Sequence, residues 1–179
     1  NHAAAHHIAY INKGFQKIAE ILPEDGYFVS MDYVGPHRNQ YPLKQWNAAL
    51  ELNQRLPQKL RQEMRYPHLP TMLVTDPTEA IHSELIIDTM SRFFYIDYHQ
   101  KIGGALAYLL LTFNDNFFKA DEEDREKWIR FVLEEDGKYL LNNPKSSMFD
   151  FIIARPNKEI LNDAEKLKSF QKMEDEREE

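Results

Sequence analysis

Three histidines near the start of the chain are the residues best suited to chemistry. His2 and His6 are four positions apart, and His7 follows directly. Residues four apart share one face of a helix, and two imidazoles on one face can chelate a transition metal. A histidine packed beside the apolar stripe through Ile11, or a tag remnant, explains the same residues. Further ligands would have to come from other segments, which offer nearby carboxylates and the histidines His37, His68, His82 and His99.

Glu79 and His82 form a second pattern, with the Glu-x-x-His spacing that di-iron helical bundles use on each of two helices. The sequence has one copy of it. Glu79 also fits a capping role at the start of a helix at 76–78, since a carboxylate in the first turn can reach back to free amides. We therefore interpret His82 as a histidine at the edge of the core. The metal alternative names four ligands for a divalent transition ion: His2, His6, His7 and His82.

Negative charge is concentrated in two segments of a chain whose net charge is −7. Residues 121–136 contain eight acidic and three basic residues, and residues 174–179 contain five and one. The rest of the chain is therefore close to neutral. Such patches repel duplex nucleic acid, and they speed and orient encounter with a basic protein surface. The basic stretch at 44–65 is interpreted as a solvated helix face.

The charge pattern predicts a non-catalytic protein-interaction or regulatory module that presents 121–136 and 174–179 to a basic partner, without a cofactor. The predicted contact residues are Asp121, Glu122, Glu123, Asp124 and Glu126. Two alternatives stay open: a metal-binding helical bundle or enzyme, and a structural piece of a large assembly with an exposed apolar patch. Hydrolase, phosphate-loop, dinucleotide and His-Glu-x-x-His motifs are missing from the sequence, which makes an enzyme less expected.

Length and composition predict a single domain over 1–179. The chain has 42% hydrophobic residues and no cysteine, which excludes disulfides, thiolate nucleophiles and cysteine-ligated metals. The longest apolar run, 105–111, is too short to span a membrane, so we expect no membrane partner and a cytoplasmic location. The acidic tail 172–179 is expected to fray, and the chain can be an excerpt of a longer one. The oligomeric state stays open.

Apolar spacing predicts a mainly α protein, a multi-helix, bundle-like domain that can include a small sheet of two or three strands. Helices are expected at 4–22, at 43–64 with a break near Leu56, at 79–100, at 105–118, at 121–136 up to Gly137, and at 157–172. The two most apolar helices, 79–100 and 105–118, are expected at the centre. Segments 26–34, 71–75 and 148–153 are the candidate strands.

Overall fold

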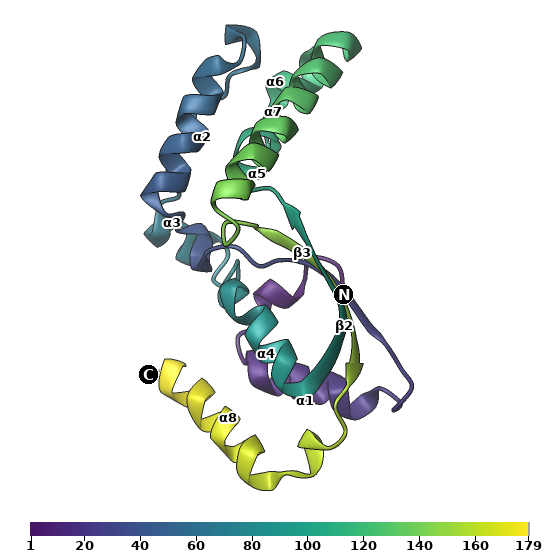
Figure 1. Ribbon diagram of the computed structural model, residues 1–179. Coiled ribbons are helices and arrows are strands. Elements are labelled where there is room, and N and C mark those ends of the chain that lie inside the picture. Colours follow the sequence, from purple (N-terminus) through teal and green to yellow (C-terminus); the bar gives the residue numbers. More distant parts are fainter. Residues whose placement is uncertain (179) are drawn as a thin grey trace.

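The fold is taken from a computed structural model that describes residues 1–178. In this part of the chain eight α-helices accompany one sheet of three strands (Figure 1). The helices are α1 Ile11–Ile21, α2 Leu43–Arg55, α3 Leu69–Thr75, α4 Ile86–Phe93, α5 Ala107–Leu111, α6 Asp115–Lys119, α7 Glu122–Asn142 and α8 Ala164–Glu178. The strands are β1 Phe28–Tyr33, β2 Phe94–Gly103 and β3 Phe149–Pro156. The mainly α prediction is confirmed in outline, whereas a bundle-like packing is not.

Strand β3 is the centre of the sheet and pairs antiparallel with β1 on one side and β2 on the other. The strands predicted at 26–34 and 148–153 correspond to β1 and β3. The third strand is β2, and the segment 71–75 belongs instead to helix α3. Buried and less buried side chains alternate along β3, as expected when one face of a strand packs on a core.

The first residues of the chain lie beside β1. The backbone N–H of Ala3 donates to the carbonyl of Met31 at 2.9 Å, and that of Met31 donates to the carbonyl of Asn1 at 3.1 Å. These bonds use the edge of β1 that β3 leaves free. They also fix where the histidine segment starts relative to the sheet.

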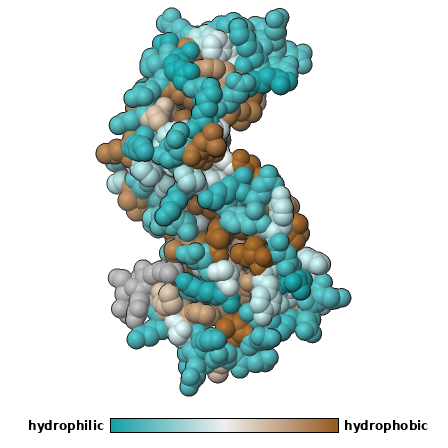
Figure 2. Space-filling model, in the orientation of Figure 1, coloured by the Kyte–Doolittle hydropathy of each residue, from teal (hydrophilic) through white to brown (hydrophobic). Residues whose placement is uncertain are grey.

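The helices fall into two groups (Figure 1). Helices α1, α4 and α8 pack with the sheet around Phe15 and Phe93, which are 0% exposed. Helices α2, α5, α6 and α7 pack around a second cluster that includes Leu110 and Val132. On the face drawn in Figure 2, apolar residues gather mainly around the middle of the molecule, while hydrophilic ones dominate the two ends.

A smaller cluster connects the two groups. It contains Tyr33 from β1 and Trp46 from α2, together with Tyr41, Ala80 and Met148. Its members come from the sheet, from helix α2 of the second group and from the loop before α4, so their packing holds these elements together. The candidate site lies beside this cluster, as the edge-on contact of the His6 and Tyr33 rings shows, with centroids 6.1 Å apart.

The prediction of a single long helix at 79–100 is wrong. Residues 76–82 run in turns and bends, α4 covers only Ile86–Phe93, and the chain then enters β2. This strand begins with Phe94, Tyr95 and Ile96, which are aromatic and β-branched residues that favour strands, and its pairing with β3 overrides the helical apolar pattern. The predicted helix at 105–118 is divided into α5 and α6.

Helix α2 ends as predicted, since Leu56 already has extended backbone angles and Pro57 follows. Helix α7, by contrast, passes through Gly137, where the sequence predicts its end, and continues to Asn142. A Cβ at Gly137 would meet no atom within 4 Å, so this glycine occupies an open position on the helix. It costs about 1 kcal/mol relative to alanine, which does not end a helix of this length.

The expectation of a frayed tail at 172–179 differs from the structure. Helix α8 continues through Glu178, and Glu174 is only 2% exposed. Its carboxylate accepts the backbone N–H groups of Asn12 at 2.6 Å and Lys13 at 3.3 Å, in the first turn of α1. The chain therefore uses an acid of the tail to satisfy a helix start that has no side-chain cap of its own. Residue 179 lies outside the described residues.

Candidate metal centre

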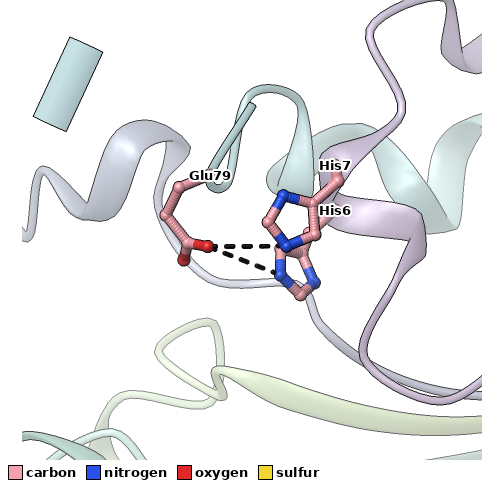
Figure 3. Close-up of side chains that lie close together, drawn as sticks. All are labelled: His6, His7 and Glu79. Carbon is pink, nitrogen blue, oxygen red and sulfur yellow. Dashed lines mark ion pairs between the residues drawn. The ribbon is translucent and has the colours of Figure 1, made fainter. Parts of the chain in front are cut away.

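The side chains of His6, His7 and Glu79 converge on one point (Figure 3). Nε2 of His6 lies 3.8 Å and Nε2 of His7 lies 3.6 Å from Oε2 of Glu79. Among the side chains that the structure describes, those of residues 1–175, this is the one group of three metal-ligating residues whose ligand atoms all lie within 4.8 Å of one another. The His6 side chain is buried, while 36% of the His7 side chain and 31% of the Glu79 side chain are exposed. An ion could therefore enter from solvent.

Two short turns bring these residues together. The helix predicted at 4–22 begins only at Ile11, and before it lies a separate 3₁₀ turn, Ala5–His7 (η1). Glu79 lies in the turns that replace the start of the predicted helix at 79–100. The backbone N–H of Ile81 donates to the carbonyl of His6 at 3.1 Å, which fastens one turn to the other.

The buried carboxylate of Asp32 orients His6. Asp32 is 1% exposed, and its Oδ1 lies 2.6 Å from Nδ1 of His6. Its carboxylate accepts from five groups: the Nδ1 of His6, the Nδ2 of Asn1 and the backbone N–H groups of Ala4, Ala5 and Tyr33. Burial alone would raise the pKa of Asp32, but hydrogen bonds from His6, Asn1 and Ala5 outweigh it and lower the pKa to about 2. An ionised carboxylate only accepts, so Nδ1 of His6 carries the proton.

His7 is oriented in the same sense by Thr78. Its Nδ1 lies 3.1 Å from Oγ1 of Thr78, and that hydroxyl donates to Oδ1 of Asp76 at 2.9 Å. A hydroxyl has one proton, which here goes to Asp76, so Thr78 must accept the proton on Nδ1 of His7. In neutral His7 the lone pair is then on Nε2, the nitrogen that faces Glu79.

Glu79 is held by Asn39, whose Nδ2 donates to Oε1 of the carboxylate at 3.2 Å. This leaves Oε2 to face the two imidazoles. Each of the three converging side chains thus has its other polar atom bound by a neighbour, as is usual for protein metal ligands.

The hydrogen bonds therefore leave two imidazole lone pairs and one carboxylate oxygen directed at the same space. Three acceptors repel one another unless a proton or a cation lies between them. A tetrahedral ion with bonds of about 2.0–2.1 Å separates its ligand atoms by about 3.4 Å, and neighbouring ligands of an octahedral ion are about 3 Å apart. The separations of 3.6 and 3.8 Å are closer to the tetrahedral value. The donor set of two nitrogens and one oxygen fits a zinc-type ion.

Without an ion, a proton on His6 is the alternative. Burial alone would lower the pKa of His6, but the hydrogen bond and charge of Asp32, with the charges of Glu79 and Asp76, outweigh it and raise the pKa. The same arrangement of acids that favours an imidazolium also favours a metal ion bound at Nε2. Binding of the ion would release that proton.

Backbone strain is concentrated next to the site. Arg38, Asn39 and Ala80 have φ values of 53°, 52° and 49°, in the left-handed region, which costs a non-glycine residue about 1–2 kcal/mol. The loops hold one another in this state, since the backbone N–H of Arg38 donates to the carbonyl of Ala80 at 2.8 Å and its guanidinium donates to the carbonyls of Pro77 and Glu79. Strain of this kind often marks functional sites.

Of the four predicted metal ligands, the structure brings together His6 and His7 only. His2 is exposed at the edge of β1, and the His82 ring stacks on His37 with centroids 6.2 Å apart. The third converging residue is Glu79, which the sequence analysis assigned to helix capping. The Glu-x-x-His spacing pointed to Glu79 but paired it with His82; its position beside His6 and His7 depends on the unpredicted turns at 76–82.

The two remaining histidines considered as further ligands, His68 and His99, each contact a nearby residue outside the metal site. His68, the residue before α3, lies 2.8 Å from the hydroxyl of Thr71 in that helix, and His99 on β2 lies 2.6 Å from the carboxylate of Asp150 on β3. Neither belongs to the group around Glu79.

The predicted acidic contact residues lie at the start of α7, and three of the five have partners within the chain. Lys59 contacts Asp124 and lies 3.9 Å from Asp121, and Glu126 pairs with Arg130 at 2.5 Å. Glu122 and Glu123 are exposed in the first turn. Surface pairs of this kind contribute about 0–1 kcal/mol each, so they leave the segment available to a partner.

Comparison with family models, with curated proteins and with solved structures finds no match to this chain. Among the described residues, every helix is too short or too polar to cross a membrane.

Proposed function

We propose that this protein binds a divalent transition metal, with zinc as the best-fitting ion, through Nε2 of His6, Nε2 of His7 and a carboxylate oxygen of Glu79. The observation that carries the proposal is the set of hydrogen bonds that turns both imidazole lone pairs toward Glu79. Asp32, Thr78 and Asn39 would be the outer partners that hold the ligands. The sequence alone placed an acidic interaction module first; the geometry favours the metal centre.

Three protein ligands leave one position of a tetrahedral ion for water, which is the composition of catalytic rather than structural zinc sites. A zinc-bound water ionises near neutral pH and becomes a nucleophile. The partial exposure of His7 and Glu79 gives solvent access to that position. Metal-dependent hydrolysis is therefore the reaction class we propose for the centre.

We expect one zinc ion per chain when tag-free, chelator-treated protein is titrated with zinc in a calorimeter. His6→Ala, His7→Ala and Glu79→Gln should each weaken binding by more than about 100-fold, beyond the 10–100-fold effect of losing an outer partner. Zinc at 100 times its dissociation constant should stabilise the unsubstituted protein by about 2.7 kcal/mol.

His68→Ala and Glu84→Gln serve as matched controls, because both residues are exposed and lie outside the cluster. They should bind zinc like the unsubstituted chain. Equal zinc binding by Glu79→Gln, or no stoichiometric zinc, would reject the centre and leave a protonated His6 between two carboxylates. Zinc binding without zinc-dependent hydrolysis of p-nitrophenyl acetate would reject only the hydrolytic step.

A second candidate function is the acidic interaction surface, favoured by the exposure of Glu122 and Glu123 where α7 starts. Their charges are close together and lie in the first turn, at the end of α7 far from the sheet (Figure 1). Such a patch would steer a basic protein surface toward this end of the molecule.

Glu122→Gln combined with Glu123→Gln should slow association with immobilised poly-lysine by about threefold to tenfold at low salt, and the difference should vanish at high salt. The control is Glu24→Gln combined with Glu165→Gln, which removes the same charge from exposed positions outside both acidic segments. If both double variants slow association equally, the effect reflects net charge and the surface at 121–126 has no special role.

A further inference from the structure

A cavity of about 350 Å³ lies next to the loop that carries Asn39. We name it the aromatic pocket and define it by Asn39, Tyr41, Trp46, Met64 and Tyr108, which all line it. It is within the size range of small-molecule sites, which are mostly apolar with a few placed polar groups.

The aromatic wall is rigidly held. The Tyr41 and Trp46 rings are nearly parallel, with an interplanar angle of 10° and centroids 6.1 Å apart, and the Tyr66 ring meets Trp46 edge-on at 5.2 Å. The Tyr66 hydroxyl donates to the carbonyl of Tyr41 at 2.7 Å, which locks the arrangement. Aromatic faces attract organic cations through their negative π surfaces.

Asn39 adds an acceptor that lacks a donor. Its Nδ2 must face the Glu79 carboxylate, which only accepts, so the amide orientation is fixed. Its Oδ1 is buried and has no hydrogen-bond partner among the described residues. An unsatisfied buried acceptor costs about 1–3 kcal/mol. A ligand with an N–H group could recover that cost if the Asn39 side chain shifts to uncover Oδ1, which solvent does not reach in the structure.

The charges around the pocket favour a cation. Glu79 lies behind Asn39, and together with burial its negative charge raises the pKa of Tyr108. At the rim, Arg65 donates to Glu63 at 2.7 and 2.9 Å, so its charge is offset. A divalent ion at the metal centre, together with the Arg38 guanidinium beside Glu79, would offset this negative charge, so the proposal concerns the metal-free protein.

We propose that the aromatic pocket binds a small organic cation that carries N–H donors, such as an amine, amidine or guanidinium group. The cation would lie against the aromatic wall and, after a shift of the Asn39 side chain that uncovers Oδ1, donate to that oxygen. This site is separate from the three metal ligands, and its occupation does not require the ion.

Benzamidine, a flat cation with N–H donors, is the probe, and benzoate is its anionic counterpart. Trp46 and Trp128 are the two tryptophans of the chain, so Trp128→Phe leaves Trp46 as the only indole reporter. In chelator-treated protein, benzamidine should change Trp46 fluorescence saturably and bind at least about tenfold more tightly than benzoate.

Asn39→Leu should weaken benzamidine binding by about tenfold, because it removes the acceptor. Since Asn39 also donates to Glu79 and has φ 52°, the comparison is made where circular dichroism shows this variant to be folded like the unsubstituted chain. Asn47→Leu makes the same change at an exposed position of α2 next to Trp46 and should leave binding unchanged. Equal binding of benzoate, or equal effects of the two variants, would overturn the proposal. The same titration in His7→Ala without metal separates the two sites, since benzamidine binding should persist in this variant when zinc binding is lost.

Discussion

Replacing Asp32 with asparagine is expected to destabilise the fold by about 3–5 kcal/mol, the usual result of removing one partner from a buried charged pair. Asparagine has the same shape but offers an NH₂ group to donors that need an acceptor. Whichever way the amide is turned, its NH₂ group faces donors: the backbone N–H groups of Ala4 and Ala5 on the Oδ2 side, or Nδ1–H of His6 on the Oδ1 side. Urea unfolding of chelator-treated protein measures the loss as a lower midpoint.

Asp88→Asn is the matched control, because Asp88 is exposed on α4 and its replacement should change stability by less than about 0.5 kcal/mol. Zinc titration gives an independent readout. If Asp32 orients a metal ligand, Asp32→Asn should also weaken zinc binding by about 10–100-fold under conditions where the variant is folded. A variant as stable as the Asp88→Asn control would contradict the hydrogen-bond network described around η1.

The sequence predicted most of the elements whose signals are local. Helix α2 ends where Pro57 removes a donor, and β1 and β3 stand out as short aromatic and β-branched runs. Strand β2 was missed because its first residues belong to a very apolar stretch, 81–96, that suits a buried helix equally well. Only its partner β3, some fifty residues later in the chain, decides between the two states.

The candidate site shows the same division between local and distant information. His6 and His7 were identified as possible ligands by residue type alone. Asp32 lies 26 positions after His6, and Glu79 lies 72 positions after His7. Loops of unpredicted geometry bring these residues together. The left-handed residues Arg38, Asn39 and Ala80 have no glycine signature that could have revealed those loops. Histidine content could thus suggest a metal, but it could not supply the carboxylate.

The acidic tail provides a test that separates the sequence-based expectation from the structure. A frayed tail predicts that Glu174→Ala is neutral, whereas the structure predicts a loss of about 3 kcal/mol. The reason is that the backbone N–H groups of Asn12 and Lys13 lose their acceptor in a place that water reaches poorly, at about 1–3 kcal/mol for each buried unsatisfied group. Thermal or urea unfolding measures the difference.

Asp175→Ala is the matched control for this tail, because its side chain is 61% exposed and lies 3.7 Å from Lys13, where a surface pair contributes about 0–1 kcal/mol. Glu174→Gln keeps an oxygen for Asn12 and should fall between the two, since it loses only the charge that favours a helix start. The order Asp175→Ala, Glu174→Gln, Glu174→Ala in decreasing stability would show that α8 docks through this carboxylate. Equal stability of all three would mean that α1 starts without it, and that the packing of Phe170 against Phe93 holds α8 in place.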